Sequence, residues 1–138
     1  MKLLIGVDGS AGSLAAVSLG GRLVSSDKDE VGLYYSPPKV DIQGGADTTE
    51  VLPTVHDLLA KAVFEKSSGQ LSPPLRDQVH TIVGQKPARQ GLVLAADQWR
   101  ADMIAVGARG LGPIASIMMG SVAGSVAHAA SVPVLVVR

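Results

Sequence analysis

The chain has no cysteine among its 138 residues, which excludes disulfide bonds and thiolate metal sites. Aromatic residues make up only 3%, and 12 basic residues balance 12 acidic ones, so no net field favours nucleic acid or an anionic membrane. No apolar run approaches the length of a membrane span, and no signal-peptide pattern opens the sequence. We therefore expect a cytoplasmic protein with neither nucleic acid nor membrane as a partner.

The sequence does contain an alternation of short apolar runs with helical patterns. The apolar runs show little polar alternation, which is typical of parallel strands covered on both faces. They are residues 3–7, 31–35, 79–83, 103–106 and 134–137. The helical patterns between them are residues 10–24, 52–66, 87–99 and 120–130. This order predicts a single α/β domain over residues 1–138, a doubly wound, five-stranded parallel sheet with helices on both faces.

Two glycine-containing elements stand nine residues apart in the last third of the chain. Gly107 and Gly110 bracket a turn after an apolar run, and Gly120 with Ser121 opens the last helical pattern. Glycine lets backbone N–H groups approach a ligand closely, and a helix start offers unpaired N–H donors to an anion. The pattern therefore predicts two sides of a phosphate site. It is neither a Walker loop nor the dinucleotide pattern Gly-x-Gly-x-x-Gly.

This glycine spacing resembles the nucleotide-binding signature of the universal stress protein family, and the chain resembles that family from end to end. The matching segments are LLIGVDGS (3–10), VGQKPA (83–88), ADMI (101–104) and VPVLVVR (132–138). The resemblance implies an adenine-nucleotide-hydrolase-like fold with strand order 3-2-1-4-5. It also implies ATP as the ligand, with Mg²⁺ or Mn²⁺ beside the phosphates.

In that strand order the first and fourth strands are neighbours at the point where the order reverses, which is where such sheets bind ligands. The turn after the first strand would therefore meet the glycine turn after the fourth. The resemblance implies nucleotide contacts at Val7, Asp8, Ser10, Tyr35, Gly107, Arg109, Gly110, Gly120, Ser121 and Val122. Asp8 is also the implied contact for the metal ion. We expect valine at position 110 or 120 to remove ATP binding and to leave the domain folded.

Several of these residues have a second interpretation. Asp8 either binds a ribose hydroxyl or a cation, or it caps the first helix, a role that Ser10 would serve equally well. Arg109 either points at phosphate or faces solvent. Tyr34 and Tyr35 point to opposite faces of a strand, so at most one of them can face a base.

The position of Tyr35 matches the family residue whose backbone meets adenine, while its side chain either faces the base or packs under the loop at residues 37–38. The three histidines, His56, His80 and His128, lack acidic companions at metal-ligand spacing, so we expect no histidine metal site.

The resemblance implies an ATP-binding regulatory protein in the stress response. The phosphate region has no histidine, second carboxylate or lysine arranged for catalysis, so we expect at most slow ATP hydrolysis. The alternative is a homodimeric interaction module of the same family that binds no nucleotide. In either case the last strand, Val134 to Val137, would lie at a sheet edge, and we expect it to pair with its copy in a homodimer.

Overall fold

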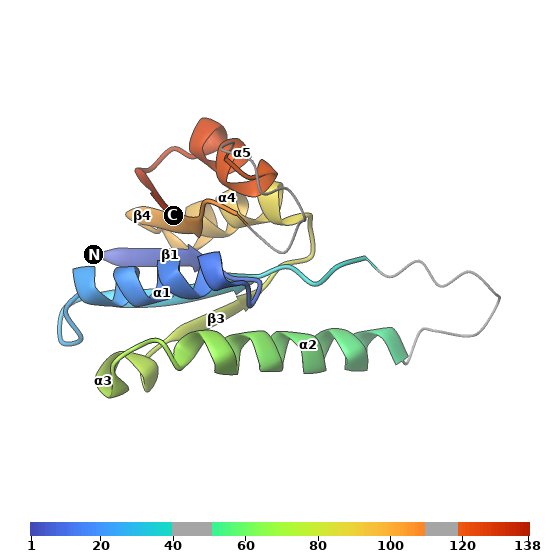
Figure 1. The fold of residues 1–138 in the computed structure, drawn as a ribbon, viewed down its shortest axis with the longest axis horizontal. Coiled ribbons are helices and arrows are strands. Elements are labelled where there is room, and N and C mark those ends of the chain that lie inside the picture. Colours follow the sequence, from blue (N-terminus) through green and yellow to red (C-terminus); the bar gives the residue numbers. More distant parts are fainter. Residues whose placement is uncertain (40–50, 110–118) are drawn as a thin grey trace.

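The computed structural model describes residues 1–39, 51–109 and 119–138, and of residues 51 and 52 it describes the backbone only. Five parallel strands form one sheet in the order β3-β2-β1-β4-β5 (Figure 1). The strands are β1 (Lys2–Gly6), β2 (Glu30–Tyr35), β3 (His80–Val83), β4 (Met103–Gly107) and β5 (Val134–Val137). The helices are α1 (Ala11–Leu23), α2 (Val51–Ser68), α3 (Pro73–Arg76), α4 (Ala88–Trp99) and α5 (Ser121–Ala129). The predicted fold class and strand order are confirmed.

The short helix α3 was not predicted, because its residues read as a proline-rich loop. Ser72 precedes Pro73 and Pro74, which occupy the first turn of a helix, where a missing N–H costs nothing. The turn closes when the Arg76 N–H donates to the Ser72 carbonyl at 2.9 Å.

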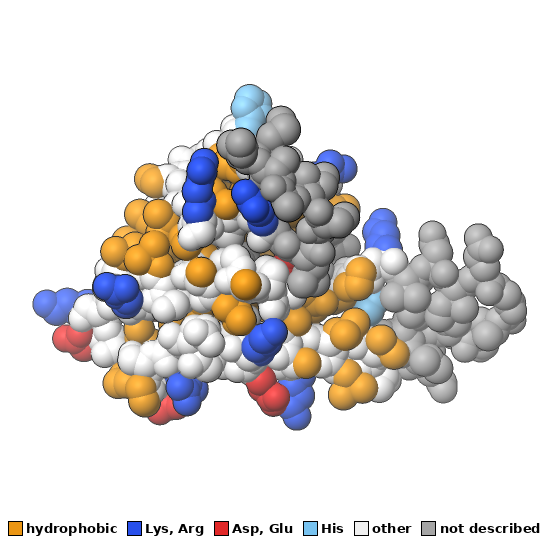
Figure 2. All heavy atoms as spheres, viewed as in Figure 1, with side chains coloured by type: hydrophobic (Ala, Val, Ile, Leu, Met, Phe, Trp, Pro, Cys, Tyr) orange, Lys and Arg blue, Asp and Glu red, His pale blue; other side chains and the backbone are white. Residues whose placement is uncertain are grey.

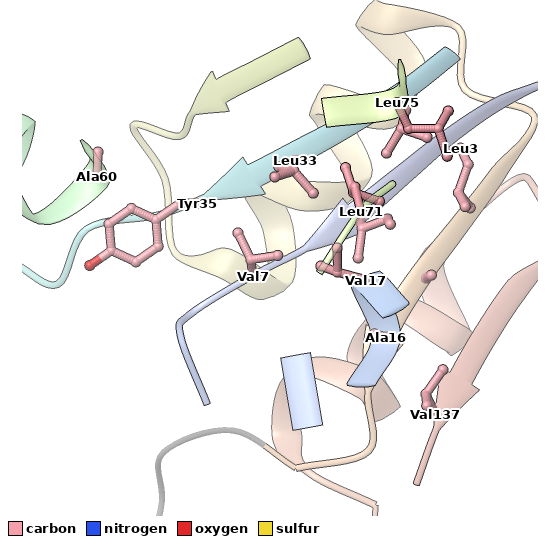
Figure 3. Packing of buried hydrophobic residues seen from close by; sticks show 13 residues of the cluster. Leu3, Val7, Ala16, Val17, Leu33, Tyr35, Ala60, Leu71, Leu75 and Val137 are labelled. Carbon is pink, nitrogen blue, oxygen red and sulfur yellow. The ribbon is translucent and has the colours of Figure 1, made fainter. Parts of the chain in front are cut away.

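Successive side chains of each strand point to opposite faces of the sheet, and each face has its own hydrophobic cluster. The first cluster includes Leu3, Ile5 and Leu33 and is covered by α1, α2 and α3 (Figure 3). The second includes Leu4 and Ile104 and is covered by α4 and α5. Figure 1 shows these helices on the two sides of the strands. The prediction that Tyr34 and Tyr35 point to opposite faces is also confirmed.

Helix α2 has two apolar faces and runs past the carboxyl edge of the sheet (Figure 1). The face toward the sheet carries Ala60, Val63 and Phe64. The opposite face carries Val55, Leu58 and Leu59, of which Leu58 is 63% exposed. In Figure 2, hydrophobic side chains are visible along this helix in the lower part of the view. No helix within the described residues has the length and hydropathy to cross a membrane.

Candidate functional site

Three backbone segments meet at the carboxyl edge of the sheet: the first turn of α1, the end of β4 and the start of α5. A Cβ atom on Gly12 of α1 would lie 2.5 Å from the carbonyl oxygen of Arg109. A Cβ atom on Gly107 would lie 2.6 Å from the carbonyl carbon of Gly12. These separations are too short for any side chain, so only glycine allows the two backbones to touch here.

The start of α5 is joined to the end of β4 in the same way. The Gly120 N–H donates to the Ala108 carbonyl at 2.6 Å, and a Cβ atom on Gly120 would lie 2.9 Å from that oxygen. Gly120 is the N-cap residue of α5, and as a glycine it has no side chain with which to cap this end of the helix. The first amide groups of α5, at Ser121 and Val122, therefore have no intrahelical acceptor.

These contacts bear on the expectation that valine at Gly120 removes ATP binding and leaves the domain folded. The Cβ atom of that valine would lie 2.9 Å from the Ala108 carbonyl oxygen, so the substitution would strain the backbone as well as enter phosphate space. Gly110, the other position chosen for that substitution, lies outside the described residues. Nucleotide binding is therefore better tested at a side chain than at a glycine.

Asp8 and Ser10 make different hydrogen bonds in the turn between β1 and α1. Ser10 is the N-cap of α1, and its Oγ accepts the Ser13 N–H at 3.2 Å. Asp8 Oδ1 accepts the Ser10 N–H at 2.9 Å, across Gly9 with its positive φ of 79°. Asp8 therefore shapes the turn, and its other carboxylate oxygen has no hydrogen-bond partner among the described residues.

Tyr35 ends β2 directly beside this turn. The Val7 N–H donates to the Tyr34 carbonyl at 2.8 Å, and the Gly84 N–H donates to the Tyr35 carbonyl at 2.7 Å. The Tyr35 ring packs edge-on against Phe64 of α2, with ring centroids 6.3 Å apart. Burial raises the pKa of the Tyr35 phenol, and the negative charge of Asp8 raises it further.

The sequence did not predict the contact that Lys66 of α2 makes with the β1–α1 turn. The Lys66 Nζ donates to the carbonyl of Gly9 at 3.0 Å, so α2 holds the β1–α1 turn from outside. A lysine in the last turn of a helix gives no sequence signal for a partner 57 residues away. The Arg109 side chain is exposed, and no hydrogen bond or ion pair within the described residues holds it.

The amide donors at this edge of the sheet suit an anionic group of a polar ligand. The edge offers the Asp8 carboxylate, of which one oxygen has no partner among the described residues, and the first amide groups of α5. Across the parts of the chain that the structure describes, no three His, Cys, Asp or Glu residues gather as a metal site. A cation held by Asp8 would therefore need further ligands from a bound phosphate group or from water.

Comparison with known proteins gives one family. The model of the universal stress protein family matches residues 1–138. Universal stress protein Rv2623 from Mycobacterium tuberculosis is 30% identical over 139 residues, which are 99% of this chain and 44% of that protein. The chain therefore spans less than half the length of this curated relative.

Solved structures of universal stress proteins share the fold. UspA from Lactobacillus plantarum has a TM-score of 0.78 at 19% identity, covering 100% of this chain and 97% of that one. The Archaeoglobus fulgidus protein in complex with dAMP has a TM-score of 0.67 at 22% identity, covering 100% and 98%. Two others were solved with cAMP and, from Arabidopsis thaliana, with AMP, at TM-scores of 0.68 and 0.65 and identities of 22% and 14%.

Proposed function

The chain belongs to the universal stress protein family, and from that premise we propose that it binds ATP, or another adenine nucleotide, as a regulatory protein in the stress response. The observation that carries the proposal is the meeting of the first turn of α1, which follows the Asp8 turn, with the end of β4 and the start of α5 at the switch point of the sheet. The cAMP, dAMP and AMP complexes of its structural relatives support the ligand class.

Each group would take a distinct part of the nucleotide. The amide groups of Ser121 and Val122 at the start of α5 suit the phosphates, and the exposed Arg109 has the freedom to add a charged donor. Asp8 suits a ribose hydroxyl or a Mg²⁺ or Mn²⁺ ion that the phosphates also bind. The backbone of Tyr35 would lie beside the base.

The test compares two carboxylates at opposite ends of the sheet. Asp8→Asn keeps an acceptor for the Ser10 N–H and removes the charge, so we expect ATP affinity to fall roughly tenfold or more, as for loss of a charged hydrogen bond. Asp102→Asn is the matched control, because Asp102 Oδ2 accepts the Lys2 N–H at the far end. Calorimetry that finds no ATP binding by the wild type, or equal affinity in both variants, contradicts the proposal.

We expect regulation rather than turnover. The groups described around Asp8 include no arranged base or nucleophile, so phosphate release should be far slower than the roughly 1 per second of slow enzymes. A metal-dependent rate in the ordinary enzyme range that disappears in Asp8→Asn would make the protein an ATPase instead. The cytoplasm is the compartment that we predict for this role.

We also propose a homodimer through β5. This strand is at one edge of the sheet, and within residues 1–39, 51–109 and 119–138 it pairs only with β4, in a register that sets Val136 beside Val106. Antiparallel pairing of two β5 strands about a two-fold axis would satisfy the backbone groups at the edge of both strands.

Light scattering should give twice the chain mass of 14.1 kDa, and Val136→Pro should return the protein to that mass. A wild-type protein that already has the single-chain mass contradicts the dimer. A dimer that binds no adenine nucleotide would favour the alternative interaction module.

A further inference from the structure

One peptide group in the turn between β1 and α1 is held from both of its sides. It is the peptide that joins Gly9 to Ser10, which is trans, so its N–H and its carbonyl point in opposite directions. Asp8 Oδ1 accepts the Ser10 N–H at 2.9 Å, and Lys66 Nζ donates to the Gly9 carbonyl at 3.0 Å. A carboxylate and an ammonium group thus hold the same peptide plane between them.

The Lys66 contact differs from the other hydrogen bonds of this turn because it comes from a distant segment. Ser10 Oγ accepts the Ser13 N–H, and the Ser10 carbonyl accepts the Ser13 hydroxyl. The Asp8 N–H donates to Ser13 Oγ at 3.4 Å, so all of these bonds stay within residues 8–13. Among the described residues, Lys66 therefore makes the one hydrogen bond that joins the Gly9–Ser10 peptide to another element, the helix α2.

Gly9 is the position at which this peptide plane has freedom to rotate. Its φ is 79°, and glycine, which has no Cβ atom, adopts several backbone conformations at little cost. A rotation of the plane would take the Ser10 N–H away from Asp8 and release the carboxylate from its present orientation. The Lys66 ammonium opposes this rotation, because the rotation would remove its acceptor. The ammonium also polarises the peptide, which strengthens the hydrogen bond on the opposite side.

We propose that Lys66 is a positioning residue of the candidate nucleotide site and fixes the direction of the Asp8 carboxylate through the Gly9–Ser10 peptide. The inference rests on the proposed nucleotide binding, since it needs Asp8 to contact the ligand. With Oδ1 bound to the Ser10 N–H, the second oxygen of Asp8 keeps one direction and is preorganised for a partner. Lys66 acts through Asp8 and needs no contact with the ligand itself.

The surroundings of Lys66 separate this role from a role in stability. The contact with Gly9 is exposed to solvent, and such contacts contribute little to the stability of a fold. Val63 and Phe64 of the same helix pack against the first hydrophobic cluster and hold α2 on the sheet. Loss of the Lys66 ammonium should therefore leave the helix in place and change the turn alone.

The first test uses the protein without nucleotide. Hydrogen exchange of the Ser10 amide is measured by nuclear magnetic resonance in the wild type, Lys66→Met, Lys66→Arg and Lys61→Met. Exchange should be about two- to fivefold faster in Lys66→Met alone, because the Ser10 N–H would be bound to Asp8 for less of the time. Removal of a positive charge by itself would slow base-catalysed exchange, so a faster rate reports the loss of the contact. Lys61→Met is the matched control, since Lys61 is an exposed lysine about 140° away around the same helix.

The second test measures ATP affinity by calorimetry in the presence of Mg²⁺. Lys66→Met should weaken binding about two- to fivefold, the scale of an exposed charged contact, and Lys61→Met should leave it unchanged. In the Asp8→Asn background the effect of Lys66→Met should shrink to less than about twofold, because Lys66 acts through the carboxylate. Lys66→Arg keeps a charged donor and should retain most of the wild-type affinity.

The outcomes separate the role of Lys66 from the nucleotide-binding function. Equal exchange of the Ser10 amide in Lys66→Met and the wild type overturns the positioning role, whatever the protein binds. Faster exchange in a protein whose wild type binds no ATP overturns the nucleotide-binding function and leaves Lys66 a residue of the turn alone. ATP binding that Lys66→Met leaves unchanged, or weakens equally with and without Asp8→Asn, overturns the positioning of Asp8.

Discussion

The charged groups at the two ends of the parallel sheet differ in whether they have partners within the protein. At the amino end, the Met1 amine pairs with Asp29 at 2.7 Å, and Glu30 pairs with both Lys2 and His80 at 3.3 Å. The Lys2 ammonium also lies 5.0 Å from the ring centroid of Trp99. These are all the ion pairs found among the described residues. At the carboxyl end, Asp8 and Arg109 form no ion pair with any residue that the structure describes.

The difference supports the proposal that a nucleotide binds at the carboxyl end. At the amino end the charges satisfy one another, and the pKa of Asp29 is lowered by the hydrogen bond from the Met1 amine and by the Ser25 N–H. At the carboxyl end, one oxygen of Asp8 and the exposed Arg109 guanidinium have no partner among the residues that the structure describes. We infer that the first end stabilises the fold and that the second is kept free for binding.

The largest effect we expect comes from filling the backbone contact at the carboxyl end. Gly107→Ala would place a Cβ atom 2.6 Å from the backbone of Gly12, so we expect the free energy of unfolding to fall by about 1–3 kcal/mol or more. Gly124→Ala in α5 is the control, since its Cβ atom would meet only Met119 Cε at 3.8 Å. A helical glycine replaced by alanine should gain up to about 1 kcal/mol. Urea unfolding that gives equal stability for both variants would show that β4 and α1 are packed less tightly than the contact between Gly107 and Gly12 indicates.

A smaller effect is expected from the paired charges of the amino end. Glu30→Gln removes the pairs to Lys2 and His80, which are exposed, so the free energy of unfolding should fall by only about 0.2–1 kcal/mol. Added salt should shrink this difference, because it screens exposed charges. Nucleotide affinity should stay at its wild-type value. A changed affinity would contradict the claim that nucleotide binds only at the carboxyl end.

The smallest effect on stability is expected from Tyr34→Phe. The lost hydroxyl is buried and makes no hydrogen bond of ordinary geometry among the described residues, although Ser36 lies near enough to oppose the rise that burial causes in the pKa of Tyr34. Its removal should therefore be close to neutral or slightly stabilising. Thermal unfolding of the variant checks this directly. A clear loss of stability would mean that the hydroxyl has a partner after all. The result sharpens the comparison, because an unpaired group that no ligand can reach contributes nothing to a site.

Much of the fold could be predicted from the sequence because strands and helices repeat with different periods. The five apolar runs became the five strands, and the alternation along a strand correctly separated Tyr34 from Tyr35. The position of β5 at an edge was also predicted correctly. These features depend on neighbours in sequence and on a strand order that the family resemblance supplied.

The rest depends on contacts between distant segments, which periodicity does not reveal. In α2, Val55, Leu58 and Leu59 look like a packing face, but they point away from the sheet, which Val63 and Phe64 contact instead. The role of Gly107 likewise depends on α1, which is distant in sequence and whose backbone at Gly12 touches it. The glycine pattern predicts phosphate contacts, while in the structure Gly107 and Gly120 allow close packing of the backbone.

One measurement tests the contrast between the two ends most directly. Amide chemical shifts of the ¹⁵N-labelled protein are followed by nuclear magnetic resonance during titration with ATP and Mg²⁺. We predict saturable shifts at the carboxyl end, in residues 7–13, 35–36, 107–109 and 120–123, and none at residues 29–30, 80 and 99–102. Shifts centred on the second group, or no saturable shifts at all, would contradict the assignment of nucleotide binding to the carboxyl edge of the sheet.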